Sequence, residues 1–473
     1  MKLNEIKFGT DGWRGTIADN FTFANVAKVS QAVADYYKIY ENRERALAVG
    51  YDTRFLSKEF AQVVAEVLAG NGFHIILSST DLPTQAISFA ISSAHLGGGI
   101  MITASHNPPQ FNGIKIRSSS GASALPEVTA KIESFLGKNK IKRAILEEAE
   151  RKKLIIKRDL VPSYIRKVES FLDIDLLKKA HLKVIYDPMF GAGDGVTQKI
   201  LANSNCEVII INQKYNPGFE GLNPEPIEEN LEDLKKKVVE EKADLGIATD
   251  GDADRVGIVD NKGRYITPHQ VFSLLLLYLV RERKMRGGVV KTVSLGYQPE
   301  RIAKKFNLSL KETPVGFKYI CEKMVKEDIL FGGEESGGYG YRGYLLERDG
   351  ILSSLLFVEM ITKTEKTLSL LLENMEEEFG ASFFGRIDFK QTGVNKKKMV
   401  EKISSLPLSS LGGVSISKVK TTDGVKFVME DESWLLIRPS GTEPKVRVYA
   451  EASNKDRLKR IIEEGVRMAK DAI

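Results

Sequence analysis

Three carboxylates occupy alternate positions in Asp250-Gly251-Asp252-Ala253-Asp254-Arg255. An apolar stretch typical of a buried strand precedes them, so their side chains can converge where that strand ends. Three acids this close repel one another unless a hard cation lies among them, and Mg²⁺ prefers oxygen ligands. An EF-hand would need a bidentate Glu at its twelfth position, where this chain has Asn261. We therefore predict a magnesium site; an acidic turn that caps a helix or meets solvent is the alternative.

A serine follows another predicted strand, in Thr103-Ala104-Ser105-His106-Asn107-Pro108-Pro109. A serine in such a loop can be a nucleophile when a neighbouring base or metal activates it. Adjacent residues of an extended segment point to opposite sides, so His106 need not touch the Ser105 hydroxyl, and no Ser-His-Asp triad is assumed. Lys115 could neutralise a phosphate nearby. The alternative is an ordinary proline-rich turn.

Three further segments have the composition of ligand loops. Arg438-Pro439-Ser440-Gly441-Thr442-Glu443-Pro444 offers a guanidinium fork, two hydroxyls and a glycine to an anion, although a Gly/Pro-rich hairpin would read the same way. Glu334 and Ser336, among glycines, are two residues apart, so in an extended chain both face one way, as groups that hold sugar hydroxyls would. The glycine of the 313–318 segment could also bring backbone close to a ligand.

The elements that must position these loops alternate between strand and helix. Phe60, Val63, Val64 and Val67 lie on one helical face, and Gly70-Asn71-Gly72 ends that helix. Short apolar runs at 46–51 and 74–77 flank it, and this strand–helix–strand order predicts a parallel sheet. Further strands are expected at 99–103, 183–186, 208–211, 244–248, 256–259 and 289–295.

The last ninety or so residues differ, with strands expected at 383–389, 425–429, 434–437 and 446–450, little helix between them, and a closing helix around 458–469. This pattern favours a separate α+β domain. We expect an α/β domain with the serine loop at 1–155 and another with the acidic loop at 156–257. A third, with the Glu334 loop, is expected at 258–378, and the α+β domain at 379–473.

Composition excludes several other classes of protein. The 473 residues are 42% hydrophobic and 28% charged, as in globular chains. The longest largely apolar run, Val271–Val280 with Ser273 inside it, is half the length of a membrane span. The first residues contain no apolar stretch long enough for the core of a secretory signal, so none is expected. The charge of +6 is spread along the chain rather than concentrated as in nucleic-acid binders, and would suit a small anionic substrate. We expect a cytoplasmic location, no nucleic-acid or membrane partner, and two buried thiols, Cys206 and Cys321.

Taken in order along the chain, these motifs resemble those of the α-D-phosphohexomutases, specifically the phosphoglucomutases and phosphomannomutases. The resemblance spans nearly the whole chain and begins at Phe8-Gly9-Thr10-Asp11-Gly12-Trp13-Arg14-Gly15. It implies three mixed-sheet α/β domains of shared topology plus a smaller C-terminal α+β domain around a central cleft. It also implies that Ser105 is a phosphoserine, which donates its phosphoryl group to the sugar through a bisphosphorylated intermediate.

The resemblance also implies roles for individual residues. Mg²⁺ would be held by Asp250, Asp252 and Asp254 together with the Ser105 phosphate. The sugar and its unreacted phosphate would be bound by Glu334, Ser336, Arg438, Ser440, Gly441 and Thr442. Catalytic positions would be Ser105, His106, Lys115, Arg255, Lys318 and Arg14. Glucose 1,6-bisphosphate would be the activator, the partner a small sugar phosphate, and the chain a monomer or homodimer.

Two positions bear on the choice of sugar. Members that act mainly on mannose phosphates commonly carry a histidine where this chain has Phe317, and another where it has Gly338. The Gly-Phe-Lys form resembles phosphoglucomutases, in which the residue matching Lys318 is a candidate general acid or base. We therefore expect a preference for glucose phosphates; phosphoglucosamine mutase, phosphomannomutase, a metal-dependent sugar phosphatase and a non-catalytic sugar-phosphate sensor are the alternatives.

Overall fold

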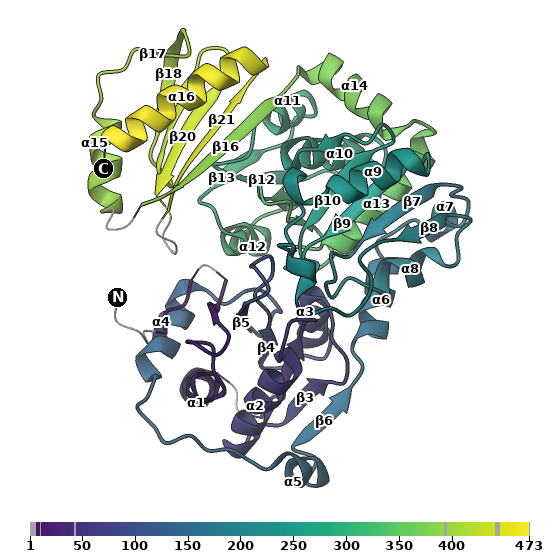
Figure 1. Cartoon of the computed structure of the whole chain (residues 1–473), viewed down its shortest axis with the longest axis vertical. Helices are drawn as coiled ribbons and strands as arrows, with labels where there is room; N and C mark the ends of the chain where they lie inside the picture. Colours follow the sequence, from purple (N-terminus) through teal and green to yellow (C-terminus); the bar gives the residue numbers. More distant parts are fainter. Residues whose placement is uncertain (1–5, 10, 42–43, 392–394, 440–444, 473) are drawn as a thin grey trace. The chain divides into compact units, whose positions relative to one another are not determined.

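The computed structural model describes residues 6–9, 11–41, 44–391, 395–439 and 445–472 (Figure 1). The chain divides into two compact units. One comprises Met1–Ile266 with Gly337–Leu368, and the other Thr267–Ser336 with Ser369–Ile473. Each unit contains two sheets or parts of sheets with their own helices.

The first sheet of the first unit has six strands in the order β1-β5-β4-β2-β3-β6. Its strands are β1 (Trp13–Thr16), β2 (Leu47–Tyr51), β3 (Ile75–Ser78), β4 (Gly98–Ile102), β5 (Phe111–Arg117) and β6 (Ile155–Arg158). Its helices are α1 (Phe23–Tyr40), α2 (Ser57–Gly70), α3 (Thr84–Ser93), α4 (Pro126–Phe135) and α5 (Leu146–Arg151). The predicted apolar face of α2 is buried against this sheet, and β2 pairs in parallel with both β3 and β4, as the strand–helix–strand order predicted. By contrast, β5 runs antiparallel to β4.

The second sheet has five strands in the order β11-β10-β9-β7-β8. These are β7 (Lys183–Asp187), β8 (Glu207–Ile210), β9 (Leu245–Thr249), β10 (Val256–Asp260) and β11 (Tyr265–Ile266). The accompanying helices are α6 (Val161–Glu169), α7 (Ile174–Leu177), α8 (Val196–Leu201), α9 (Glu232–Glu240) and α13 (Gly350–Thr364), with 3₁₀ turns η1 (Phe219–Gly221) and η2 (Glu228–Asn230). Helix α13, which follows the short strand β15 (Tyr339–Tyr341) in the chain, packs against β9 and β10.

The second unit contains a parallel set of strands in the order β13-β12-β14. Its strands are β12 (Gly288–Thr292), β13 (Leu310–Thr313) and β14 (Ile329–Gly333), and its helices are α10 (Pro268–Arg281), α11 (Gln298–Lys305), α12 (Phe317–Lys326) and α14 (Leu368–Phe379). Helix α10 begins with a capping box, in which the Thr267 hydroxyl accepts from the Gln270 N–H and the Gln270 side chain accepts from the Thr267 N–H.

The C-terminal sheet of the second unit is antiparallel, in the order β16-β21-β20-β19-β18-β17. Its strands are β16 (Phe383–Lys390), β17 (Ser410–Leu411), β18 (Val414–Lys420), β19 (Val425–Met429), β20 (Trp434–Pro439) and β21 (Lys445–Ala452), with helices α15 (Lys396–Ser404) and α16 (Lys455–Asp471). Helix α16 lies across this sheet and buries Ile461, Ile462 and Ala469 against it (Figure 1).

One strand order recurs in the three α/β domains. The first strand lies between the second and the third: β3-β2-β4, β8-β7-β9 and β13-β12-β14. The loop that follows the third strand carries the serine in the first domain, the three aspartates in the second and Glu334 in the third. The expected fold class, three α/β domains of shared topology and a smaller C-terminal α+β domain, is confirmed.

Some local predictions were wrong. Strand β12 stops at Thr292 because the chain turns there, with the Leu295 N–H bonded to the Thr292 carbonyl at 3.0 Å. Helix α15 and strands β17 and β18 were not predicted. Side chains of β18 are mostly exposed, so the strand lacks the apolar signal of a buried one. Cys206 is half-buried rather than buried; only Cys321 is buried, and neither forms a disulfide.

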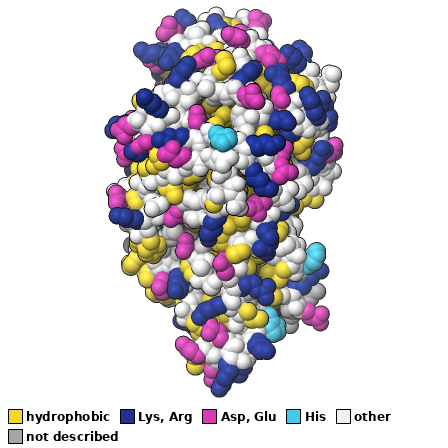
Figure 2. Space-filling model, turned by 90° about the vertical axis from the view of Figure 1, so that its right-hand side faces the viewer, with side chains coloured by type: hydrophobic (Ala, Val, Ile, Leu, Met, Phe, Trp, Pro, Cys, Tyr) yellow, Lys and Arg dark blue, Asp and Glu magenta, His cyan; other side chains and the backbone are white. Residues whose placement is uncertain are grey.

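Charges are mixed on the surface. On the face seen in Figure 2, basic and acidic side chains are interspersed, in keeping with the predicted spread of charge. Within the described residues, no helix is long and apolar enough to cross a membrane.

Candidate active site

The serine loop and the acidic loop meet within the first unit. The Ser105 hydroxyl, fully buried, donates to Asp250 Oδ2 at 2.8 Å. Gly251 lies directly against the Ser105 carbonyl, and any Cβ at that position would overlap the carbonyl oxygen. The sequence predicted the two loops separately. In the structure, the candidate nucleophile Ser105 is hydrogen-bonded to Asp250, a candidate metal ligand.

The backbone at Ser105 corrects one premise of the sequence argument. Its φ is +53°, so the chain turns at the serine rather than running extended. His106 Nδ1 consequently lies 3.4 Å from the Ser105 hydroxyl, at the edge of hydrogen-bonding distance. No third residue completes a Ser-His-Asp triad in the described contacts, because the aspartate bonds the serine itself. The positive φ is maintained by the surrounding hydrogen bonds, which over-determine the loop.

Arg54 supplies most of those bonds. Its guanidinium, fully buried, donates to four backbone carbonyls of the loop, those of Ser105 and Asn107 at 2.6 Å, Pro108 at 3.0 Å and Phe111 at 3.1 Å. Asp52 lies 3.3 Å from Arg54 Nε. Burial raises the pKa of Asp52 to about 6, despite the opposing charge of Arg54. Sequence reasoning missed this pair, although its position after parallel strand β2 was a usable signal.

The three aspartates form a compact group of buried carboxylates. Asp250, Asp252 and Asp254 each present an oxygen within 4.8 Å of the other two. Lys115 Nζ donates to Asp252 Oδ2 at 2.7 Å and Asp254 Oδ2 at 3.0 Å. Among the described residues, Asp252 Oδ1 and Asp254 Oδ1 are buried without a hydrogen-bond partner. Two unsatisfied carboxylate oxygens beside a third acid are the ligand set that a hard divalent cation requires, so these residues fit Mg²⁺.

The pKa values of the group diverge. Burial and the charges of Asp254 and Asp252 raise the pKa of Asp250 well above its usual value. Burial also acts to raise the pKa of Asp252, but Lys115, Thr84 and Arg348 together outweigh burial and lower that pKa. The pKa of His106 is well below its usual value, because burial and the nearby Arg255, Arg14 and Lys115 disfavour the imidazolium. A site with this many fixed positive groups is suited to an anionic substrate.

Other predicted catalytic residues surround the serine in the same unit. Arg14 Nη1 donates to Asn107 Oδ1 in the serine loop at 2.6 Å. Arg255 Nε lies 3.8 Å from Asp254 Oδ1, and its backbone N–H donates to Asp250 Oδ1 at 3.0 Å. Ser105, His106, Lys115, Arg14, Arg255 and the three aspartates are therefore assembled in one place.

Sequence reasoning missed Arg348 and the role of Asp11. Arg348 Nη2 donates to Asp254 Oδ2 at 2.5 Å and to Asp11 Oδ2 at 3.1 Å, and Asp11 lies 3.0 Å from Lys115 Nζ. The Arg348 side chain fills the space beside Gly338, where a Cβ would overlap its Cδ and lie 2.9 Å from its Cγ. No sequence signal marked Arg348, since nothing in its local pattern differs from a solvated arginine before a helix.

The predicted sugar and phosphate residues belong to the second unit. Glu334 Oε1 accepts from the Gly316 N–H at 2.9 Å, and Asp423 Oδ2 accepts both from the Val315 N–H at 3.2 Å and from Arg438 Nε at 2.7 Å. The 313–318 loop thus connects Glu334 with Arg438, through an aspartate that sequence reasoning did not single out. Ser440, Gly441 and Thr442 lie outside the described residues.

Two details of these loops differ from expectation. Ser336 lies in a turn, so the premise of an extended segment from Glu334 to Ser336 is wrong. The Ser336 hydroxyl is buried without a hydrogen-bond partner among the described residues. Phe317 and Lys318 begin helix α12 and are 5% and 7% exposed, with Lys318 Nζ 5.4 Å from the Tyr319 ring centroid.

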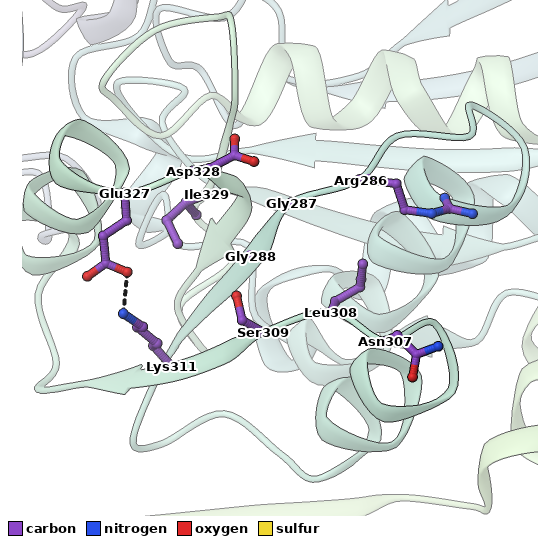
Figure 3. A pocket seen from close by; sticks show the side chains of 10 residues that line it. All are labelled: Arg286, Gly287, Gly288, Asn307, Leu308, Ser309, Lys311, Glu327, Asp328 and Ile329. Atoms are coloured by element: carbon purple, nitrogen blue, oxygen red, sulfur yellow. Dashed lines mark hydrogen bonds and ion pairs between the residues drawn. The ribbon is translucent and has the colours of Figure 1, made fainter.

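A hollow of about 450 Å³ lies elsewhere on the second unit (Figure 3). It is lined at the amino ends of β12, β13 and β14, where Gly288, Ser309 and Ile329 stand, and Lys311 pairs with Glu327 across one side. Because parallel strands share their ends, this is the opposite edge of the sheet from the Glu334 loop. Ligands of α/β sheets bind at the carboxyl edge, so the hollow is not part of the candidate site.

The comparisons with known proteins match nearly the whole chain. Residues 5–143, 162–263 and 267–379 match alpha/beta/alpha domains I, II and III of "Phosphoglucomutase/phosphomannomutase", and residues 394–467 match its C-terminal domain. A "Phosphoglucomutase/phosphomannomutase" of Thermococcus kodakarensis is 31% identical over 98% of this chain and 99% of its own. A "Phosphoglucosamine/phosphogalactosamine mutase" of Sulfurisphaera tokodaii is 30% identical over 97% of each chain. The crystal structure of a "putative phosphomannomutase" from Thermus thermophilus has a TM-score of 0.86 at 34% identity, covering 98% of this chain and 99% of its own.

Proposed function

The chain belongs to the phosphoglucomutase/phosphomannomutase family, and we propose that it interconverts hexose 1-phosphate and hexose 6-phosphate, with glucose the preferred sugar. Enzymes of this family are isomerases that transfer phosphate within a sugar. The proposed reaction uses Ser105 as the phosphate carrier, with glucose 1,6-bisphosphate as activator. We also propose the four domains at 1–155, 156–257, 258–378 and 379–473.

The observation that carries this proposal is the hydrogen bond of 2.8 Å between the Ser105 hydroxyl and Asp250, one of three buried carboxylates. A serine hydroxyl is a weak nucleophile unless a base or a metal acts on it. Here it is held against a carboxylate cluster in a loop that Arg54 fixes from four carbonyls. Such fixed positioning is what phosphoryl transfer chiefly requires of a protein.

The charged residues around Ser105 would stabilise the transferred group. Mg²⁺ held by Asp250, Asp252, Asp254 and the Ser105 phosphate would neutralise charge on the phosphoryl oxygens. Arg14 and Arg255 flank the loop, and Lys115 and Arg348 hold the two aspartates that have free oxygens. His106 and Arg14 would orient the phosphate from the serine side.

The sugar half of the proposal rests on the second unit. Glu334 and Ser336 would bind sugar hydroxyls, and Arg438, Ser440, Gly441 and Thr442 the phosphate that does not react. The link from Glu334 through the 313–318 loop to Asp423 and Arg438 supports a common site, because one short loop sets the spacing between the two groups. Lys318, at the end of that loop, is the proposed general acid or base.

The preference for glucose rests on Phe317 and Gly338. Glucose and mannose phosphates differ only at C2, and the Phe317 ring offers no hydrogen bond to an axial hydroxyl. This chain has neither of the two histidines that mannose-acting relatives commonly carry. At position 338 it also lacks room for one, because Arg348 occupies the space that a side chain there would need. A site that merely tolerates a misplaced hydroxyl rejects it by about a hundredfold or less, so mannose would be a slower substrate.

Phosphoglucosamine mutase activity is the second candidate, favoured by the Sulfurisphaera relative, whose name includes that activity. A single experiment separates the candidates: kcat/KM for glucose 1-phosphate, mannose 1-phosphate and glucosamine 1-phosphate, each with and without Mg²⁺ and the matching bisphosphate. We expect the highest value for glucose 1-phosphate. A higher value for glucosamine 1-phosphate would move the chain to that branch of the family, and phosphate release without isomerised product would identify a phosphatase.

A further inference from the structure

A pocket of about 230 Å³ lies within the second unit, apart from every residue placed at the candidate active site. Strand β12 and helix α11 form one side of it, and strands β18, β19 and β20 of the C-terminal sheet form the other. Four of its lining side chains are lysines: Lys291, Lys418, Lys420 and Lys426. The Tyr297 and Trp434 rings supply its apolar part.

Two of these lysines are buried, which is unusual for the residue type. Lys291 is 1% exposed and Lys426 is 3% exposed. The Lys426 ammonium donates to the Val293 carbonyl at 2.6 Å and lies 4.3 Å from the centroid of the Trp434 ring. Lys291 donates to the carbonyls of Leu295 and Gly296 at 3.1 and 2.7 Å.

Carboxylates at the pocket only partly balance these ammonium groups. Glu300 pairs with Lys291 at 2.8 Å. Glu312, which is not itself a lining residue, is shared by Lys420 at 3.0 Å, Lys426 at 3.3 Å and Lys291 at 3.8 Å. The third acid, Glu432, is paired with Arg301 at 2.5 Å. Lys418 has no ion pair within the described part of the chain.

The incomplete balance of charge in the pocket affects Lys426 most. Burial first, and then the charge of Lys291, lower the pKa of Lys426 to about 7. A buried cation without full compensation is costly, and an anion bound beside it would remove that cost. The pocket has room for a small oxyanion among Lys418, Lys420 and Lys426, and the exposed Lys418 adds positive charge that would attract one.

We propose that this pocket is a binding site for a small oxyanion, a phosphate or carboxylate group, held by Lys418, Lys420 and Lys426. Its walls come from the β12–β14 domain and from the C-terminal sheet, so the occupant bridges the two domains. Strand β20, which begins at Trp434 in the pocket, ends at Arg438 and Pro439. An occupied pocket therefore stabilises the strand that carries Arg438, whichever sugar the enzyme uses.

Tryptophan fluorescence gives a local readout, because the chain has only two tryptophans, Trp13 and Trp434. In a Trp13→Phe background of the full chain, Trp434 alone reports on the ammonium that lies over its ring. Titration with inorganic phosphate at constant ionic strength should change its emission saturably. Adding Lys426→Met should raise the half-saturating concentration at least about tenfold, since one charge-assisted contact is lost. Acetate in a parallel titration separates phosphate from carboxylate as the bound group.

Matched variants keep the test specific. Lys418→Gln, at an exposed position, should weaken binding a few-fold without affecting folding, and it covers the case in which Lys426→Met does not fold. Lys311→Met, which removes a lysine at the other hollow of the same unit, should leave the titration unchanged. Arg438→Ala should also leave it unchanged. A response that survives Lys426→Met and Lys418→Gln but disappears in Arg438→Ala would place the phosphate at the candidate active site and overturn the proposal. A response equal to that of sodium chloride would overturn it as well.

Discussion

Replacing Gly338 by alanine should damage the acidic cluster through Arg348, whose side chain lies nearest to a Cβ added at that position. The backbone at Gly338 is not in the left-handed region, and the three atoms nearest to a Cβ added there all belong to the Arg348 side chain. An alanine Cβ would overlap Arg348 Cδ, in the middle of that side chain rather than at its flexible end. Arg348 would have to leave its position, and its hydrogen bonds to Asp254 and Asp11 would lengthen or break.

The size of the effect follows from those two bonds. Each hydrogen bond to a charged group contributes about 1.5–3 kcal/mol, and Lys115 remains beside both carboxylates to limit the loss. We expect Gly338→Ala to cost about 2–4 kcal/mol, and Arg348→Ala a similar amount. The double variant should cost no more than Arg348→Ala alone, because the overlap is gone. The coupling energy between the two positions should therefore equal the cost of Gly338→Ala alone, about 2–4 kcal/mol.

Thermal melting and calorimetric titration with Mg²⁺ measure both consequences without relying on turnover. We expect a lower melting temperature and weaker Mg²⁺ binding in each single variant. Gly218→Ala is the matched control, because Gly218 is exposed with φ at −88° and a Cβ added there would have Asn216 Oδ1, at 3.3 Å, as its nearest neighbour. Additive effects of Gly338→Ala and Arg348→Ala would refute the reasoning.

Three other predictions concern single groups. Asp252→Asn should abolish most Mg²⁺-dependent turnover, because a metal ligand is lost, and should leave the fold intact, because a charge that repels the other two aspartates is lost with it. Normal activity in this variant would contradict the assignment of Asp252 as a metal ligand. Lys318→Met should lower kcat for glucose and mannose phosphates alike and leave their ratio unchanged; a changed ratio would give Lys318 a part in sugar choice. The pKa of Lys426, about 7, is below that of an unfolded lysine, about 10.4, so between these values the unfolded chain binds more protons and stability rises with pH. The rise in melting temperature from pH 7 to 9.5, measured without added oxyanion, should therefore be smaller in Lys426→Met; an equal rise would contradict the lowered pKa.

The sequence predicted the parts of the fold that depend on local apolar patterns. Strands β2, β9 and β19 and helix α2 are buried along one face or throughout, so their hydrophobic residues recur at the expected spacing. Strand β18, mostly exposed, gave no such signal. The serine loop was located correctly, but its conformation was not, because the positive φ of Ser105 depends on Arg54, which lies 51 residues earlier.

The residues of the candidate site also differ in whether the sequence alone could reveal them. Ser105, Asp250, Asp252 and Asp254 stand out by their own motifs. Arg54, Arg348 and Asp423 do not, because each acts on a loop that is distant in sequence and has an ordinary local context. Contacts between residues far apart in sequence are determined by tertiary packing. A single sequence therefore does not show which distant residue a buried arginine will contact.

The central claim is that Ser105 carries the phosphate in turnover. It is tested most directly by incubating the enzyme with glucose 1,6-bisphosphate labelled in its phosphates and following the label by peptide mass analysis and rapid quench. We predict label on the peptide that contains Ser105, and its transfer to added glucose 1-phosphate at least as fast as kcat. Absence of label from that peptide during steady turnover, or undiminished turnover in Ser105→Ala, would contradict the claim.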